Sequence, residues 1–395
     1  MNTLSSPITV CQLLHTLNVG GAEILASRLA RRMAGERWKF VFFCLDAPGV
    51  RAKEMEEAGF TVEILGRKPG LDRHCMRELV RLWKKHDVRF VQAHQYTPYF
   101  YAMGARGLLG QKPPILFTEH GRFYPDLPNW KHAVFNRLLM RKADRITAVS
   151  ASVGRAIIEN EGIPANRVEV IRNGVNEARF RDSQLSNTEK SELRASLGLT
   201  DERVILFTAR LDPIKDHRTA ILAMKRLLML PEIEKSTRKP TLLLAGGGPE
   251  WEALREFTAE NHLLLGKHVR FLGERADVSE LLQIADAFLL TSKSEGIPLT
   301  ILEAFASGVP VTATEVGGIP EIIDTEKNGL LAPSGDFVRI SEQLKRILTD
   351  TDLSTRLIQN ARRRFDAEFT ETCMLEKYER IYEEMVAGKC VRKTS

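Results

Sequence analysis

The sequence lacks any run of about 18 apolar residues, which a transmembrane helix would require. Its N-terminus also lacks the basic start and the small-residue cleavage site of a secretory signal peptide. Five cysteines are scattered without paired spacing, which argues against a disulfide framework and against a zinc site. We therefore expect a cytoplasmic protein with reduced thiols, in which Cys11 and Cys44 belong to the core.

Sequence signals for several other functions are also missing. No compact basic tract with interleaved aromatics appears, so we expect no nucleic-acid partner; the net charge of +6 fits ordinary surface residues, anionic small ligands or an anionic membrane surface. No strand is followed by GxGxxG, which disfavours a nicotinamide oxidoreductase. The single DxD, Asp350–Asp352, lies between two helical segments and is interpreted as a helix cap. With no other cluster of metal-ligand spacing, we expect no metal and no cofactor.

Short apolar runs alternate with helix-length periodic segments along the whole chain, and this alternation predicts parallel sheets with crossover helices. A length of 395 residues is too great for one core and predicts two domains. We expect an α/β fold of two doubly wound, Rossmann-like domains facing each other across a cleft. The predicted domains are 1–185 and 186–370, and a polar linker with one short helix is predicted at Asn176–Arg203. Residues 371–395 are predicted to form a terminal helix that packs back on the first domain, plus a tail.

The stretch Ser292–Gly318, SKSEGIPLTILEAFASGVPVTATEVGG, has the clearest chemistry. It follows an apolar strand, starts a helix at Pro298 and ends that helix at Gly308. A helix N-terminus after a glycine-containing turn favours anions. Glu295 precedes this helix and Glu303 lies on its second turn. Carboxylates beside an anion site suggest a ligand with phosphates and hydroxyls, such as a nucleotide sugar.

Other polar residues follow predicted strands, at the edge where parallel sheets bind ligands. Arg210 and Lys215 share one loop, and two cations there suit a diphosphate. His94 and His120 end adjacent strands. A lone histidine at such a place is more often structural than catalytic, but two at adjacent strand ends make a functional role for His120 an equal alternative. Gly20 and Gly21 open the first helix, where paired glycines let the backbone approach a ligand closely. A plain tight turn is an equal alternative.

Together these motifs resemble glycosyltransferase family 4, a family of retaining enzymes with the GT-B fold. The most specific element is Glu-x7-Glu, Glu295 to Glu303. Five further matches stand in order along nearly the whole chain: GGAE at 20–23, EHG at 119–121, ARLDPIKD at 209–216, GGGP at 246–249 and VGGIPEII at 316–323. One departure is Ala209, where many members have glycine.

The resemblance implies roles for individual residues. The catalytic candidates are His120 near the reacting sugar, Arg210 and Lys215 on the donor diphosphate, and Glu295 on the sugar hydroxyls. The donor-binding candidates are Gly20, Gly21, Gly296, Ile297, Pro298, Leu299 and Glu303, the last of which would hold the ribose. The implied reaction is metal-independent, retaining transfer in which Glu295 positions the sugar and does not attack it.

The resemblance implies transfer of a hexose-type sugar from a UDP- or GDP-linked donor to a glycan or lipid-linked acceptor, in polysaccharide or glycoconjugate synthesis. The basic, aromatic segment 122–142 has a helical second half, which predicts either peripheral contact with the anionic inner face of the membrane or an ordinary amphipathic helix packed on the sheet. The main alternative function is a nucleotide-sugar epimerase of similar fold, and a non-catalytic binding protein is a further one.

Overall fold

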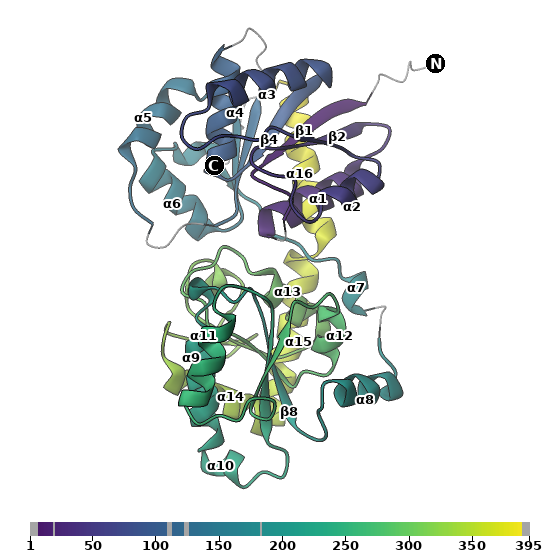
Figure 1. The fold of residues 1–395 in the computed structure, drawn as a ribbon, viewed down its shortest axis with the longest axis vertical. Helices are drawn as coiled ribbons and strands as arrows, with labels where there is room; N and C mark the ends of the chain where they lie inside the picture. Colours follow the sequence, from purple (N-terminus) through teal and green to yellow (C-terminus); the bar gives the residue numbers. More distant parts are fainter. Residues whose placement is uncertain (1–6, 19, 109–112, 122–125, 182–183, 389–395) are drawn as a thin grey trace. The chain divides into compact units, whose positions relative to one another are not determined.

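The computed structural model describes residues 7–18, 20–108, 113–121, 126–181 and 184–388. The chain divides into two compact units (Figure 1). The first contains the residues up to Asn173 together with those from Met374 onward, and the second is Gly174–Cys373. Each unit has its own parallel sheet, so the predicted α/β class with two Rossmann-like domains is confirmed.

The first unit is built on a seven-stranded sheet in the described residues, with the order β3-β2-β1-β4-β5-β6-β7. Its strands are β1 (Ile8–Leu14), β2 (Trp38–Cys44), β3 (Thr61–Ile64), β4 (Val88–His94), β5 (Ile115–Glu119), β6 (Arg145–Ala148) and β7 (Val168–Val170). All pair in parallel. The order reverses beside β1, and loops leaving the carboxyl ends of β1 and β4 therefore diverge there, which opens a ligand crevice in this class of sheet.

Helices cover both faces of this sheet. They are α1 (Gly21–Met33), α2 (Ala52–Glu57), α3 (Arg73–Lys85), α4 (Tyr96–Leu108), α5 (Trp130–Leu139), α6 (Ala151–Glu161), the 3-10 turn η1 (Ala165–Arg167) and the terminal α16 (Glu371–Val386). One core lies between the sheet and α3, α4 and α6, and a second lies under α1 and α16. Helix α16 packs Tyr382 against Trp38 and Phe90 and buries Tyr378 in the same core, which confirms that the C-terminal helix contacts the first domain.

The second unit contains, in its described residues, a six-stranded parallel sheet of order β10-β9-β8-β11-β12-β13. Its strands are β8 (Arg203–Thr208), β9 (Pro240–Ala245), β10 (Val269–Gly273), β11 (Ala287–Leu290), β12 (Val311–Thr314) and β13 (Leu330–Ala332). Its helices are α7 (Ala178–Arg181), α8 (Asn187–Ser196), η2 (Pro213–Lys215), α9 (His217–Leu228), α10 (Pro231–Glu234), α11 (Trp251–Glu260), α12 (Val278–Gln283), α13 (Leu299–Ser307), η3 (Ile319–Glu321), α14 (Phe337–Thr349) and α15 (Thr351–Glu368).

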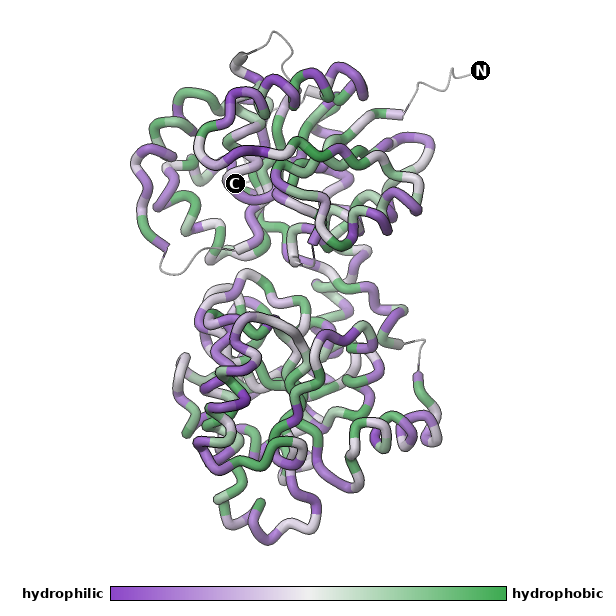
Figure 2. Tube along the Cα trace, viewed as in Figure 1, coloured by the Kyte–Doolittle hydropathy of each residue, from purple (hydrophilic) through white to green (hydrophobic). Residues whose placement is uncertain are grey.

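Strands β8, β9 and β11 of the second unit are almost entirely apolar and buried, as expected where helices cover both faces of a parallel sheet. Figure 2 shows the contrast: the helices change between hydrophilic and hydrophobic colours along their length, whereas the strands are mostly hydrophobic. Asp350 accepts a hydrogen bond from the backbone N–H of Leu353 (2.9 Å) and caps α15, so the interpretation of the DxD as a helix cap is confirmed.

The structure differs from the sequence-based expectations in some details. The units divide at Asn173, before the predicted 185, because Val175 pairs with the segment around Thr370 of the second unit. The linker contains α7 and α8 instead of one short helix. Strands β7 and β13 were not predicted, since three residues are too few to display a period.

Candidate active site

At the carboxyl edge of the second sheet, the loop after β9 packs closely on the loop after β8, and glycines make this contact possible. A Cβ on Gly246 (φ +154°) would lie 1.9 Å from the carbonyl oxygen of Ala209, and one on Gly248 (φ +153°) would lie 2.4 Å from that of Leu211. The N–H of Leu211 donates to the carbonyl of Gly247 (2.8 Å). The GGGP motif therefore allows the backbone around Arg210 to lie directly on the next loop, which only glycine permits.

The Gly317–Gly318 turn holds Glu295 by its backbone. A Cβ on Gly317 (φ +55°) would lie 2.0 Å from the Glu295 carbonyl oxygen, and the N–H of Gly318 donates to that oxygen (3.1 Å). This contact joins the start and the end of the Ser292–Gly318 stretch. The position of Glu295 is thus set by backbone packing as well as by its own side chain.

The side chains of Lys215 and Glu295 meet in this unit. Lys215 Nζ donates to Glu295 Oε1 (2.6 Å), and the hydroxyl of Ser292 donates to the same oxygen (2.6 Å). Lys293 N–H donates to the Ile214 carbonyl (2.8 Å), which fastens the lysine loop to the glutamate loop. Two residues predicted from separate motifs therefore form one polar cluster, and Ser292 belongs to it although sequence reasoning did not single it out.

Arg210 lies at the end of β8 with its side chain 70% exposed, and it forms an ion pair with Asp212. Burial raises the pKa of Asp212, but the hydrogen bond from the Ile214 N–H and the Arg210 guanidinium outweigh it, and the pKa is lowered overall. Asp212 thus stays ionised and orients Arg210. Sequence reasoning missed it, although it lies in the same loop as the two cations.

Helix α13 begins at Leu299, and Pro298 is its N-cap with φ −70° and ψ 116°. The helix therefore starts one residue after the predicted Pro298, because that ψ is extended and not helical. Pro298 provides no side-chain cap for the first N–H groups, which leaves this end suited to an anion. Gly296 and Ile297 are buried just before it, Glu303 lies half-buried further along, and Gly308 (φ +71°) ends the helix as predicted.

In the first unit, Gly20 is the N-cap of α1 in extended conformation, and Gly21 begins the helix. A Cβ on Gly20 would lie 2.5 Å from Oε2 of Glu23, whereas one on Gly21 would meet nothing within 4 Å. His120 follows β5, and its Nε2 lies 2.8 Å from Nδ1 of the buried His94. The two histidines predicted at adjacent strand ends are thus in direct contact.

Three residues that sequence reasoning missed lie at the carboxyl ends of β1, β2 and β3. His15 Nδ1 lies 2.8 Å from Asp46 Oδ2, and Arg67 Nε donates to Asp46 Oδ1 (2.7 Å). Burial raises the pKa of Asp46, but the hydrogen bonds and charges of Arg67 and His15 lower it by more, so the pKa is lowered overall. Each of these residues closely follows a strand, and that position was visible in the sequence. Single charged residues after strands are common, however, so the position alone did not identify them.

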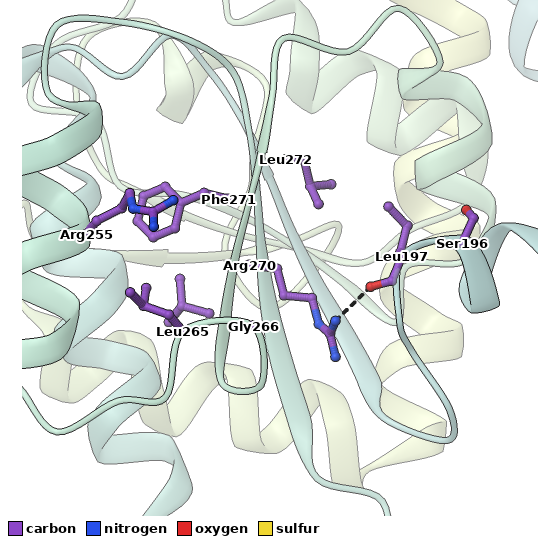
Figure 3. Close-up of a pocket in the computed structure, with 9 residues that line it drawn as sticks. Ser196, Leu197, Arg255, Leu265, Gly266, Arg270, Phe271 and Leu272 are labelled. Carbon is purple, nitrogen blue, oxygen red and sulfur yellow. Dashed lines mark hydrogen bonds between the residues drawn. The ribbon is translucent and has the colours of Figure 1, made fainter.

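A pocket of about 520 Å³ opens elsewhere in the second unit (Figure 3). It lies along the edge strand β10, from Leu265 and Gly266 before that strand to Leu272 near its end. Arg270 reaches across it and donates to the carbonyl of Leu197 (2.7 Å). None of the predicted site residues lines this pocket.

Within the described part of the chain, no three His, Cys, Asp or Glu side chains gather as a metal site would require. In that same part, no helix combines the length and the apolar character that crossing a bilayer requires.

Two doubly wound units, each built on a sheet of parallel strands, and a polar cluster at a helix start define a protein of the GT-B glycosyltransferase class. Comparison with known proteins agrees. Residues 189–364 match the family model "Glycosyl transferases group 1", and residues 19–179 match "Glycosyltransferase Family 4". The chain belongs to glycosyltransferase family 4, a retaining, metal-independent family that uses nucleotide-sugar donors.

Individual relatives extend over most of the chain. An uncharacterized glycosyltransferase of Methanocaldococcus jannaschii is 30% identical over 71% of this chain and 70% of its own length. The N-acetyl-alpha-D-glucosaminyl L-malate synthase of Bacillus anthracis is 25% identical over 92% of this chain and 94% of its own. The solved structure of Anabaena Alr3699/HepE in complex with UDP superposes with a TM-score of 0.80 at 21% identity, covering 95% of this chain and 100% of that one.

Proposed function

We propose that this chain transfers a hexose-type sugar from a UDP- or GDP-linked donor to a glycan or lipid-linked acceptor. The observation that carries the proposal is the cluster in which Lys215, Ser292 and Glu295 meet beside the N-terminus of α13. A cation and a helix start suit the diphosphate, and a carboxylate suits sugar hydroxyls. The family assignment favours transfer over the epimerase alternative, which would need no acceptor.

In this proposal the chemistry is charge stabilisation. As the sugar leaves with oxocarbenium character, negative charge grows on the departing diphosphate, and Arg210, Lys215 and the first N–H groups of α13 neutralise it. Glu295, held by its backbone and by Ser292, positions the sugar. The acceptor attacks on the face that the leaving group vacates and gives its proton to a phosphate oxygen, which retains the anomeric configuration.

The remaining predicted residues complete the donor contacts. The backbone of 296–299 meets sugar and phosphate, Glu303 holds the ribose, and Gly20 and Gly21 border the phosphates and the acceptor. His120 lies near the reacting sugar. The hydrogen-bonded group of His15, Asp46 and Arg67 lies at the same sheet edge as His120, and we propose that it contacts the acceptor.

A donor screen tests the function. The intact protein is incubated with UDP-, GDP- and ADP-sugars, and thermal shift and donor hydrolysis are measured. We expect one UDP- or GDP-sugar to raise the melting temperature and to be hydrolysed slowly. If no donor stabilises the protein and Lys215→Ala changes neither readout, the transferase proposal fails. Interconversion of the donor sugar without any acceptor would instead indicate an epimerase.

We predict that transfer survives chelation. Because Arg210, Lys215 and the α13 N-terminus supply the positive charge, removing divalent cations leaves the charge stabilisation in place. Transfer measured after dialysis against EDTA should stay within about twofold of the untreated rate. Abolition by EDTA and recovery with Mg²⁺ or Mn²⁺ would contradict this mechanism.

For the acceptor we propose a lipid-linked molecule reached from the cytoplasmic face of an anionic membrane. Helix α5 packs Phe135 and Leu139 toward the core of the first unit. Its other side exposes Trp130 (72%), Val134 and Leu138 (75%), which are spaced by four residues. Basic residues accompany this stripe, as in helices that lie on anionic lipid: Lys131, Arg137, Arg141 and Lys142. Residues 122–125 of the predicted basic segment lie outside the described residues.

We predict that Trp130→Ala with Leu138→Ala weakens membrane binding. The double variant removes the exposed apolar side chains and leaves the packed face of α5 intact, so liposome co-sedimentation should fall several-fold while the fold is retained. The control is Met229→Ala, which removes an equally exposed apolar side chain (71%) in the second unit. Wild-type sedimentation that is the same with and without anionic lipid would refute membrane contact.

A further inference from the structure

The ring of His120 is held by a chain of buried side chains. Its Nε2 lies 2.8 Å from His94 Nδ1, and His94 Nε2 lies 2.6 Å from Gln12 Oε1. Gln12 Nε2 donates to Gln92 Oε1 (3.1 Å) and to the hydroxyl of Tyr382 (3.1 Å), which itself donates to Gln92 Oε1. The chain thus runs from the end of β5, through β4 and β1, to helix α16, which Figure 1 shows beside β1 and β4.

Two threonines beside Gln92 determine which group donates and which accepts in these hydrogen bonds. The hydroxyl of Thr147 lies 3.4 Å from the carbonyl oxygen of Phe117 and 2.9 Å from the hydroxyl of Thr118. A carbonyl oxygen only accepts, so Thr147 donates to it, and Thr118 must then donate to Thr147. Thr118 is therefore free to accept from Gln92 Nε2 (3.0 Å), which turns the amide oxygen of Gln92 toward Gln12.

The orientation of Gln92 determines which nitrogen of each histidine carries the proton. Gln92 Oε1 accepts from Gln12, so Gln12 Oε1 faces His94 and must accept from its Nε2–H. A neutral imidazole has one N–H, and His94 Nδ1 is then an acceptor. The hydrogen atom between the two rings consequently belongs to Nε2 of His120.

The other nitrogen of His120 carries a lone pair. Nδ1 is buried and, among the described residues, has no hydrogen-bond partner. Burial lowers the pKa of His120 to about 3 and that of His94 well below its ordinary value, so both rings are neutral near pH 7 and each carries one proton. An unprotonated nitrogen would repel phosphate oxygens and would accept from a hydroxyl.

We propose that Gln12, His94 and Tyr382 are positioning residues that fix His120 in the Nε2-protonated tautomer, so that Nδ1 accepts a hydrogen bond from a hydroxyl of the transferred sugar. The assignment of the hydroxyl as a sugar's rests on the proposed function, whereas the tautomer does not. One consequence is that Tyr382 on α16, near the C-terminus of the polypeptide, helps to set the tautomer of His120 after β5.

The test is the ring-nitrogen NMR signature of His120. The full-length protein is labelled with ¹⁵N-histidine, and the His120 signals are identified by their loss in His120→Gln. The wild type should show an unprotonated Nδ1 and a protonated Nε2. A protonated Nδ1 would overturn the proposal directly, without any variant.

Two variants test the chain itself. Gln12→Leu removes the acceptor of His94, and the His120 signals should move toward values averaged over both tautomers. Tyr382→Phe removes one hydroxyl and leaves the shape, so a smaller shift in the same direction is expected even if Gln12→Leu does not fold. The control is Tyr99→Phe, because the Tyr99 hydroxyl is buried without a hydrogen-bond partner in the described part of the chain. Unchanged His120 signals in folded Gln12→Leu or Tyr382→Phe would overturn the proposal that these residues position His120.

The sugar contact has its own readout. Adding the donor found by the screen should shift the Nδ1 signal of wild-type His120, whereas the nucleoside diphosphate alone should not. Gln12→Leu should lower kcat by about tenfold with little change in donor KM, as expected for one lost neutral hydrogen bond. If the tautomer is as proposed but no donor moves Nδ1, the sugar contact is refuted and the positioning chain stands.

Discussion

Replacing Lys215 by alanine should reduce the kcat/KM of sugar transfer by about a hundredfold or more. Lys215 supplies a point charge beside the α13 N-terminus, and loss of one preorganised group that stabilises developing charge typically has an effect of this size. The variant also leaves Glu295 with Ser292 alone on the shared oxygen, so the sugar should be held less firmly. The measurement is steady-state transfer with the donor that the screen identifies.

Two comparisons separate a role at the site from a general effect of charge. Lys327→Ala removes an exposed lysine from the same unit, where it pairs only loosely with Asp324 (3.6 Å), and should leave transfer unchanged. Lys215→Arg keeps the charge on a bulkier, planar group and should recover only part of the activity. A Lys215→Ala protein with wild-type melting temperature and less than a tenfold loss would remove Lys215 from the proposed mechanism.

The position of the site along the chain could be predicted from sequence because parallel sheets bind ligands at one edge. Apolar strands ending near residues 209 and 291 placed Arg210, Lys215 and Glu295 at that edge before any contact was known. The structure brings Lys215 and Glu295 together at 2.6 Å, as two loops leaving neighbouring strands allow. The assignment of each to diphosphate or sugar stays a prediction.

The supporting contacts could not be predicted, because they depend on pairs of residues far apart in sequence. Ser292 and Asp212 are ordinary polar loop residues until their partners are known. Gln12 and Gln92 interrupt apolar strands, and the strand pattern alone gives no reason for a buried amide. Their register in the parallel sheet places them side by side, which is long-range information.

The largest effect on stability is expected at a site remote from the predicted chemistry. Arg106 on α4 and Asp144 before β6 form a buried ion pair in the first unit, with side chains 2% and 0% exposed. The guanidinium donates to both carboxylate oxygens (2.6 and 2.9 Å) and to the carbonyl of Leu139 (2.8 Å). Asp144 also accepts from the N–H groups of Ile115 and Arg141, so one carboxylate joins α4, β5 and the turn before β6.

Asp144→Ala should therefore lower the free energy of unfolding of the first unit by about 3–5 kcal/mol, because the guanidinium of Arg106 would remain buried without its counter-charge. Two backbone N–H groups would lose their acceptor as well, which adds to the loss. Urea denaturation followed by fluorescence measures the change. Asp201→Ala, which removes an exposed carboxylate (78%) from an ion pair in the second unit, should unfold almost as the wild type does. If Arg106→Met with Asp144→Leu recovers much of the stability, the loss in Asp144→Ala comes from the unpaired charge; if the double variant is as unstable as Asp144→Ala, the backbone contacts of Asp144 dominate instead.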